Sequence, residues 1–489
     1  MNKRYIFCLS LLLAAFSLFS YSLTDSVFGN RILSYDARSL AMGNTGITNG
    51  ARPMYSQLNP AVTASLGSKL AMEFSFGSTQ LEETRSLPFF NQFDNYVEDE
   101  VYAANTHGYA DYAGAITSSL KYGRSTYAVG LDFMPIVDFG GKYREEIRNS
   151  SNSDLDTYPN LIARNAITNK GKLNSGGINI AYMIDLDKAK FSLGLKYASL
   201  IGTNDQSTTI RWTQWAIDQA INAPNNWNQT TNTADPGHNI LPDYTKTVSR
   251  DLYGTQMQAG FTAQYLDRVI IGFKYTPKTD ITVSNLKYEN YQEIFGEGQR
   301  NDLPMTAEDS LLIKDYSLPT SLKFGFSYTP RNIFRTVFNA EVEVVEWKQT
   351  NKFFDNVVNY SVGLEHGINE RFPLRMGFNT ETTFQTIIDN HYFYANKIMT
   401  PTISAGTGYA MSSKVYFDFG IAYSFRNFEA LDLFKDTYYN DKQYNENASN
   451  YLLWPNSSHS IVLTNRGWEN PDSVKESFVK VLASITYTW

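Results

Sequence analysis

Side chains that could catalyse a reaction or bind a metal are scattered along this 489-residue chain. The sequence contains neither a Gly-x-Ser-x-Gly elbow, which exposes a nucleophilic serine, nor a His-Glu-x-x-His helix, which binds zinc through two histidines. The histidines lack ligand spacing and are His107, His238, His366, His391 and His459. A triad assembled from distant strands stays open as an alternative, because spatial neighbours need not be neighbours in sequence. We therefore predict no enzyme, no cofactor and no metal site.

Ionisable side chains recur on one face of the strands predicted below. They are Asp132, Lys196, Lys274, Lys323, Glu341, Glu343, Glu365, Arg375 and Asp418. Inside a polar interior, opposite charges of this kind can simply pair with each other. Lys274 and Lys323 flank the long segment 277–318, however, and two cations there could attract the anionic head group of a ligand. These two lysines are our candidates for binding such a group.

Two segments between strands carry apolar residues that a solvated loop would not favour. The first contains Trp212, Trp215, Ile217 and Ile221, and the second contains Tyr288, Tyr291, Ile294 and Phe295. Such residues either pack one loop against another or form an apolar surface that captures a hydrophobic ligand. We take all eight as candidate ligand-binding residues.

The elements that would position these side chains are short stretches in which apolar and polar residues alternate. In the segment 414–426, for example, Val415, Phe417 and Phe419 share one face and Asp418 lies on the other. About fourteen stretches show this period, most of them near the 9 to 11 residues of a tilted membrane-crossing strand. They are 69–79, 110–121, 125–135, 177–185, 190–201, 255–266, 268–276, 319–329, 334–347, 358–366, 372–381, 401–411, 414–426 and 477–489.

The connections between these stretches alternate between short and long. Turns such as 121–124 and 186–189 are brief, whereas 202–254, 277–318 and 427–476 are long. Outer-membrane barrels keep short turns in the periplasm and long loops outside. The pattern predicts an all-β fold, a transmembrane antiparallel β-barrel of about 14 strands over residues 69–489.

Composition agrees with a barrel whose alternate side chains face lipid. Aromatic residues make up 15% of the chain, which suits belts at the two membrane interfaces, and a mean hydropathy of −0.34 is compatible with a polar interior. The net charge of −7 argues against a nucleic-acid partner. A large soluble β-protein is the alternative.

The first residues resemble a cleavable export signal. A basic start at Lys3 and Arg4 precedes an apolar run and small residues near position 22, which predicts a signal peptide over 1–22. Cys8 is the one cysteine and lies inside that run, so the mature chain would have no thiol. Residues 23–68 show no sustained alternation and are rich in Gly, Asn and Ser.

That second segment carries a family resemblance. The stretch Ala37–Gly43, followed by Asn59, Pro60 and Ala61, looks like the start of the FadL/TodX family of outer-membrane transporters for long-chain fatty acids and other hydrophobic compounds. In that family the segment is an N-terminal hatch inside the lumen, which implies the same for residues 23–68. The strand from Tyr127 to Pro135 resembles the family strand that is kinked to open a lateral exit, with Gly130 and Pro135 as candidates. Proline suits such a place because it removes a ladder donor.

The resemblance extends to the carboxyl end, where Tyr487 and Trp489 are similar to an outer-membrane assembly signal. After Pro135 the family often has an aromatic residue and a glycine, whereas this chain has Ile136 and Val137. The long outer loops do not align. The resemblance implies ligand capture at the extracellular loops and passage through a hatch-gated barrel, without chemical change. It also implies a monomer in the cell outer membrane whose partners are hydrophobic small molecules, outer-membrane lipids and the assembly machinery.

Three other interpretations remain. A PorV-like interaction component would use the same barrel to dock exported proteins, and a long loop such as 427–476 would suit that role. A general diffusion pore would conduct steadily, which a hatch of this length opposes. An outer-membrane hydrolase would need a triad that the motifs do not show.

Overall fold

The computed structural model describes most of the chain beyond residue 27. The described residues are 28–50, 52–67, 70–90, 95–148, 161–214, 217, 227–228, 233–234, 242–293, 300–305, 309–333, 335–369, 371–389, 392–430, 433–434, 451–452, 462–463 and 471–489. The predicted signal peptide lies outside them and stays a prediction.

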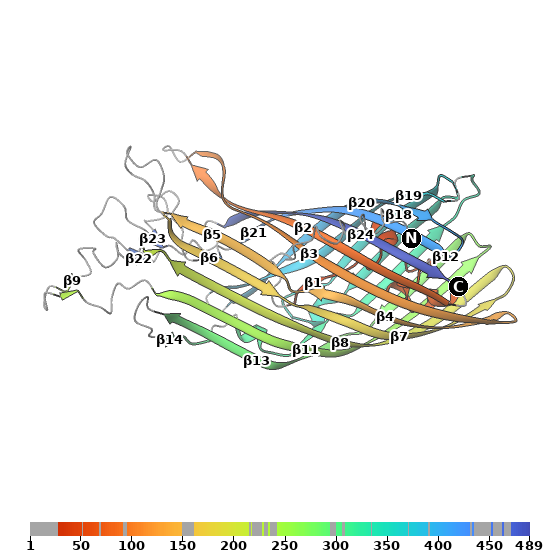
Figure 1. Ribbon diagram of the computed structural model, residues 1–489, viewed down its shortest axis with the longest axis horizontal. Helices are drawn as coiled ribbons and strands as arrows, with labels where there is room; N and C mark the ends of the chain where they lie inside the picture. The colour runs from red at the N-terminus through yellow and green to blue at the C-terminus, as the bar shows by residue number, and fades with distance from the viewer. Residues whose placement is uncertain are drawn as a thin grey trace, which may run out of the picture.

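A closed antiparallel barrel forms the body of the molecule (Figure 1). Among the described residues, fourteen strands follow one another around it, as predicted, and pairing between the last and the first closes the ring. They are β2 (Leu70–Phe90), β3 (Tyr96–Tyr122), β4 (Ser125–Asp138), β7 (Lys172–Asp185), β8 (Ala189–Trp212), β11 (Asp243–Tyr265), β12 (Val269–Thr276), β16 (Ser321–Tyr328), β17 (Val337–Val345), β18 (Val357–Gly367), β19 (Pro373–Asp389), β20 (Tyr392–Ala410), β21 (Val415–Ala430) and β24 (Asp472–Thr488).

The alternation in sequence becomes an apolar outside and a polar inside. In β8, Phe191, Leu193 and Leu195 are exposed on the outer surface, while Ser192 and Lys196 are buried toward the lumen. Exposed apolar side chains on every second residue are what a strand needs where it meets lipid. The outward apolar residues of the alternating strand segments therefore form the surface suited to face the membrane.

Several strands extend further outward than the alternation predicted. The stretch predicted to end at residue 201 continues in β8 to Trp212 and is paired with β11 as far as Ile210. Beyond Ile201 the outward-facing residues become polar, beginning with Thr203 and Asp205. The hydrophobic signal ends where the lipid would end, but the backbone ladder does not, because its hydrogen bonds need no apolar face.

The remaining strands and helices are short or lie beyond the ring. The strands are β1 (Asn30–Arg31), β5 (Gly141–Arg148), β6 (Leu161–Lys170), β9 (Trp227–Asn228), β10 (Thr233–Ala234), β13 (Thr279–Glu293), β14 (Arg300–Asp302), β15 (Tyr316–Leu318), β22 (Tyr451–Leu452) and β23 (Val462–Leu463). The helical pieces are α2 (Ala37–Ala41), α3 (Tyr55–Leu58), η2 (Pro60–Ser65), α5 (Asp309–Leu312) and η4 (Trp347–Gln349). In the described part of the chain, none of the helices has the length and apolar character to span a membrane.

The N-terminal segment, residues 28–67, lies inside the barrel. Helix α2 contacts β20 and β21, and η2 contacts β7, β8 and β11 on the opposite wall. Nearly all described side chains from 28 to 64 are buried. The segment therefore crosses the lumen and touches strands on both sides of it.

Asn59 organises the turn of this segment that meets the barrel wall. Its side-chain oxygen accepts a hydrogen bond from the amide of Ala61 at 3.0 Å, and Pro60 opens η2. Its side-chain amide donates to the carbonyls of Ile47 at 2.7 Å and Phe261 at 3.3 Å. The asparagine thus caps its own helix while tying the segment to β11.

Glycines on the inner face of the barrel make room for this segment. A Cβ atom on Gly194 would collide with the backbone of Pro60 and Ala61, and one on Gly260 would collide with the side chain of Asn59. Gly272 is similarly crowded by the backbone of Ile47. These three glycines are explained by the close approach of the N-terminal segment.

Candidate ligand-binding site

A cavity lies between the N-terminal segment and the wall formed by β11, β12 and β16 to β19. It contains about 1060 Å³ of empty space, part of which is open to solvent. Part of its lining is apolar and includes Ile32, Leu33, Ile136, Val137, Val345 and Trp347. The rest is polar or charged and includes Arg31, Lys274, Lys323, Glu343 and Glu381. The cavity thus offers an apolar and an ionic surface to one ligand.

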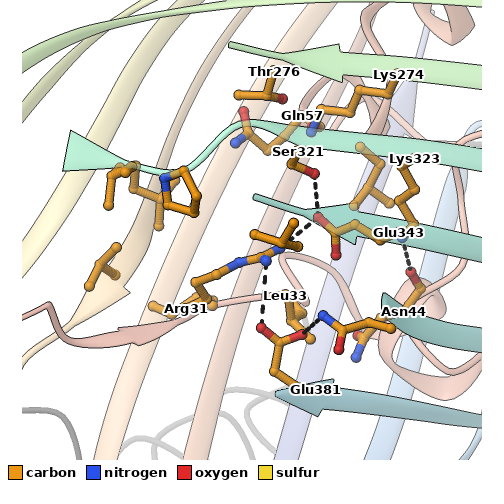
Figure 2. A pocket seen from close by; sticks show the side chains of 18 of the residues that line it. Arg31, Leu33, Asn44, Gln57, Lys274, Thr276, Ser321, Lys323, Glu343 and Glu381 are labelled. Atoms are coloured by element: carbon orange, nitrogen blue, oxygen red, sulfur yellow. Dashed lines mark hydrogen bonds and ion pairs between the residues drawn. The ribbon is translucent and has the colours of Figure 1, made fainter. Parts of the chain in front are cut away.

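Arg31 lies between two carboxylates of the barrel wall, as Figure 2 shows. Its guanidinium is 2.8 Å from the Glu343 carboxylate and 3.6 Å from that of Glu381. Ser321 donates a further hydrogen bond of 2.5 Å to Glu343. These contacts join β1, the first strand of the N-terminal segment, to β17 and β19.

Lys274 differs from the other lysine of the cavity. Lys323 forms an ion pair of 2.8 Å with Glu341 and donates to the carbonyl of Asn44 at 3.2 Å. Lys274 donates to the backbone carbonyl of Gln57 at 2.6 Å, and within the described residues its ammonium makes no ion pair with a carboxylate. Its partly buried positive charge is therefore not neutralised by a direct partner in this part of the chain.

The other inward charges predicted from sequence are paired. Lys196 forms an ion pair with Asp132, and Arg375 forms one of 2.7 Å with Asp418. Two arginines of the N-terminal segment complete the set: Arg38 lies 2.9 Å from Glu365 and Arg52 lies 2.6 Å from Asp418. These charges hold the N-terminal segment in the lumen and are not open to a ligand. In the ranges that the structure describes, no group of three metal-binding side chains occurs.

An aromatic cluster covers the cavity on the side away from the short turns. Its core contains Phe28, Trp347, Phe354 and Phe384, all buried. Phe354 stacks on Phe384 at 4.7 Å between ring centroids, and Phe28 meets Phe354 edge to face at 5.4 Å. Phe28 and Trp347 also line the cavity.

The apolar loop residues predicted as ligand contacts do not line this cavity where they are described. Trp212 donates from its indole to the carbonyl of Pro242 at 3.0 Å, and Ile217 is buried in the same loop. Tyr288 packs against the aromatic cluster and donates to Asp309 at 2.8 Å. Tyr291 lies beneath the guanidinium of Arg300, 3.9 Å from ring centroid to carbon. The other four lie outside the described residues and are Trp215, Ile221, Ile294 and Phe295.

The sequence did not single out several residues of the cavity. Arg31, Phe28 and Leu33 belong to a segment without periodicity, and their place in the lumen depends on contacts with strands hundreds of residues away. Glu381 is the last residue of the predicted strand 372–381 but lies inside β19, and Trp347 is the last residue of the predicted strand 334–347 but begins η4. The available signal was the presence of three arginines, Arg31, Arg38 and Arg52, in a segment rich in Gly, Asn and Ser.

The wall of the barrel is interrupted between β3 and β4. The ladder between them runs from Tyr122–Ser125 to Gly114–Phe133 and ends there, two residues before Pro135. Gly130 lies inside the paired part, opposite Thr117. Above the break, residues 134–141 are all buried.

A small hollow of about 200 Å³ lies at this interruption. Its lining includes Ala113 of β3, Pro135 of β4 and, from the N-terminal segment, Ile32 and Tyr35. Ile32 and Tyr35 also line the main cavity, so they form the partition between the two spaces. Burial raises the pKa of the Tyr35 hydroxyl, which stays protonated and donates to the Ile32 carbonyl at 2.7 Å.

The carboxyl end of the chain closes the ring at the end that carries the short turns. The rings of Tyr487 and Trp489 meet edge to face at 4.2 Å between centroids, and the amide of Trp489 donates to the Leu70 carbonyl at 2.9 Å. Their role as an assembly signal stays a prediction.

Comparison with known proteins identifies relatives by structure alone. No family model matches the sequence, and no curated protein matches it. Among solved structures, a Pseudomonas aeruginosa FadL homologue matches 94% of this chain and 99% of its own at 12% identity, with a TM-score of 0.54. The Pseudomonas putida toluene transporter TodX matches 95% of this chain and 99% of its own at 11% identity, with a TM-score of 0.51. The chain therefore has the fold of the FadL and TodX barrels, as the resemblance in sequence implied.

Proposed function

We propose that this protein carries hydrophobic compounds with an anionic head group, long-chain fatty acids among them, across the outer membrane without changing them chemically. The observation that carries the proposal is the position of Lys274, an ammonium without a carboxylate partner in the described residues, at the edge of a half-apolar cavity. A partly buried charge without a carboxylate partner favours an anion beside it, so an anion beside Lys274 would be stabilised there. The apolar lining would take the hydrocarbon tail.

The fold supports transport as the general function. The structures with the same fold are named as a FadL homologue and a toluene transporter. The anionic head group is the part of the proposal that depends on this chain alone. An uncharged compound such as toluene would gain nothing from the ammonium of Lys274, whereas an anionic head group would.

We infer a route that begins at the extracellular loops and continues through the aromatic cluster into the cavity. Residues 23–68 would act as the hatch, because Ile32 and Tyr35 separate the cavity from the hollow at the interruption of the wall. Movement of this partition would join the two spaces. The ligand would then leave sideways between β3 and β4 or downward past the hatch.

The test is uptake of oleate by proteoliposomes, and by a host that lacks its own transporter. Oleate uptake should be higher with the barrel than with an empty membrane in both systems. Equal uptake by a protein shown to be correctly folded would defeat the proposal. Binding is measured on the same protein with oleate and with oleyl alcohol, which has the same chain and no charge. Hydrogen bonds to charged groups contribute about 1.5–3 kcal/mol, so Lys274→Met should weaken oleate binding by about 10- to 100-fold.

The measurement with oleyl alcohol distinguishes loss of head-group binding from loss of the fold. Lys274→Met should leave its affinity nearly unchanged, because the alcohol has no charge to lose. Lys190→Met is the matched control, since Lys190 forms its ion pair with Asp267 at a short turn, away from the cavity. Equal losses for both ligands in Lys274→Met would show that the lysine supports the fold and not the head group.

A further inference from the structure

Above the interruption of the wall, β3 and β4 are held by different partners. The free edge of β4 pairs with β1 and not with β3: Asn30 lies opposite Asp138 and Arg31 opposite Val137. The amide of Ile32 continues this contact with a hydrogen bond of 2.9 Å to the carbonyl of Ile136. The N-terminal segment has thus taken the place that β3 would occupy in an uninterrupted barrel.

On the β3 side, the gap is crossed by a lysine from a strand further along the wall. Lys172 begins β7 and lies opposite Asp138 in the β4–β7 ladder. Its ammonium reaches past β4 to β3, where it donates to the carbonyl of Ala110 at 2.7 Å and to the carboxylate of Asp111 at 2.5 Å. It also lies 3.3 Å from the carboxylate of Asp138. One side chain therefore joins β7, β4 and β3 where the ladder is missing.

The neighbouring contacts show that this corner of the barrel is built around the lysine. Asp111 faces a second ammonium, that of Lys480 on β24, at 3.8 Å. Asp138 is fixed by the amide of Gly140 at 2.7 Å. Another crossing bond runs from the amide of Arg144 to the side chain of Asn105 at 3.0 Å. The two carboxylates that hold Lys172 are themselves held in place.

We propose that Lys172 is a latch that keeps the gap between β3 and β4 closed. A backbone ladder opens only if many hydrogen bonds break together, whereas this gap is bridged by two side chains: Lys172, with its three oxygen contacts, and Asn105, which accepts the single bond from the Arg144 amide. The latch lies beside the hollow that Asp111 and Ala113 line. The inference rests on the proposed function in one respect: a cargo that leaves sideways must first displace Lys172 from Asp111.

Opening of the gap can be measured without any cargo. Ala113 is buried, faces inward and lines the hollow, so Ala113→Cys is a reporter of access to the gap. With Cys8→Ser the reporter is the one thiol of the chain. The rate of its modification by a lipophilic maleimide is measured in proteoliposomes, and folding is checked by heat-dependent electrophoretic mobility.

Lys172→Met should raise the modification rate of this reporter by about tenfold, which corresponds to about 1.4 kcal/mol of lost closure. Lys172→Arg keeps the charge and should restore the slow rate. Lys190→Met is the matched control and should change nothing, because Lys190 is 28% exposed and ion-paired like Lys172, which is 27% exposed, but lies at a short turn. An unchanged rate in Lys172→Met, or an equal rise in Lys190→Met, would overturn the proposal.

The two proposals fail in different measurements. Oleate uptake decides the proposed function, while the thiol rate in cargo-free vesicles decides the latch. If oleate uptake is absent but Lys172→Met still raises the modification rate of the reporter thiol, the latch is supported and transport of fatty acids is refuted. If oleate uptake is present but Lys172→Met leaves the modification rate unchanged, the latch is refuted and the cargo leaves by another route.

Discussion

Arg38 of α2 and Glu365 of β18 form an ion pair through two parallel hydrogen bonds, both 2.9 Å long. The pair joins the N-terminal segment to the barrel wall across 327 residues of sequence. Glu365 also accepts a bond of 2.5 Å from Arg375, which continues to Asp418 and from there to Arg52. The segment is therefore anchored twice to one chain of alternating charges, and its release would have to break both anchors.

The first prediction concerns this anchor. Arg38→Met removes one partner of a buried pair, and such losses cost about 3–5 kcal/mol when the remaining charge has no other partner. Glu365 keeps Arg375, so we expect a smaller loss, about 1–3 kcal/mol in the free energy of unfolding. Urea titration in detergent micelles measures it. Arg124→Met is the control, because the Arg124–Asp187 pair is exposed and should contribute almost nothing; equal effects would contradict the anchor.

The second prediction tests the fit between barrel and N-terminal segment. Gly194→Ala places a methyl group against the backbone of Pro60 and Ala61, and overpacking of this kind costs about 1–3 kcal/mol. Gly176→Ala on β7 is the matched control, since no atom lies within 4 Å of its added carbon. That variant should be neutral or slightly stabilising. Thermal unfolding of both variants measures the contrast, and a Gly194→Ala protein as stable as the control would show that the segment does not touch this wall.

The third prediction concerns the aromatic cluster over the cavity. Phe354→Ala removes a ring that stacks on Phe384 and meets Phe28 edge to face, so the aromatic cluster packs less tightly over the cavity. We expect faster binding and faster release of a fluorescent fatty acid, by about tenfold, as measured by stopped flow. The neighbouring Phe353→Ala is the control, because Phe353 is exposed and outside the cluster. Unaltered rates in Phe354→Ala would mean that the ligand enters elsewhere.

The fourth prediction concerns the final residue. Trp489 packs against Tyr487 and closes the ring at Leu70, so we expect Trp489→Ala to lower the amount of folded barrel in the outer membrane severalfold. Trp489→Phe keeps an aromatic ring and should restore most of it. Membrane fractions from cells that express each variant provide the measurement. If Trp489→Ala assembles normally, the aromatic end is not an assembly signal in this chain.

The fourteen strands could be predicted because lipid imposes a period of two on the outer face. The same reasoning could not find their outer ends, since above Ile201 the outward residues of β8 are polar although the ladder continues. Lys274 and Lys323 were predicted together, and both line the cavity. Lys323 has a carboxylate partner because the side chain of Glu341 turns toward it, whereas Lys274 has none in the described residues. The sequence does not determine which of the two lysines Glu341 contacts.

Residues without periodicity could not be placed at all. Arg31 belongs to a segment with no regular pattern, and its partner Glu343 is 312 positions away. Pro135 marked the neighbourhood of the interruption because proline removes a ladder donor. That Lys172 would cross the gap could not be foreseen, since the contact depends on where the ladder between β3 and β4 ends.

The exchange of partners at β4 has a consequence for hydration. The edge of β4 above Phe133 uses its backbone groups to bind Asn30, Arg31 and Ile32. If the N-terminal segment withdraws, those backbone groups lose their hydrogen-bond partners. Unpaired amides and carbonyls are tolerated only where water can reach them. The segment can therefore withdraw only as fast as water enters behind it, so a wet lumen becomes a condition for opening.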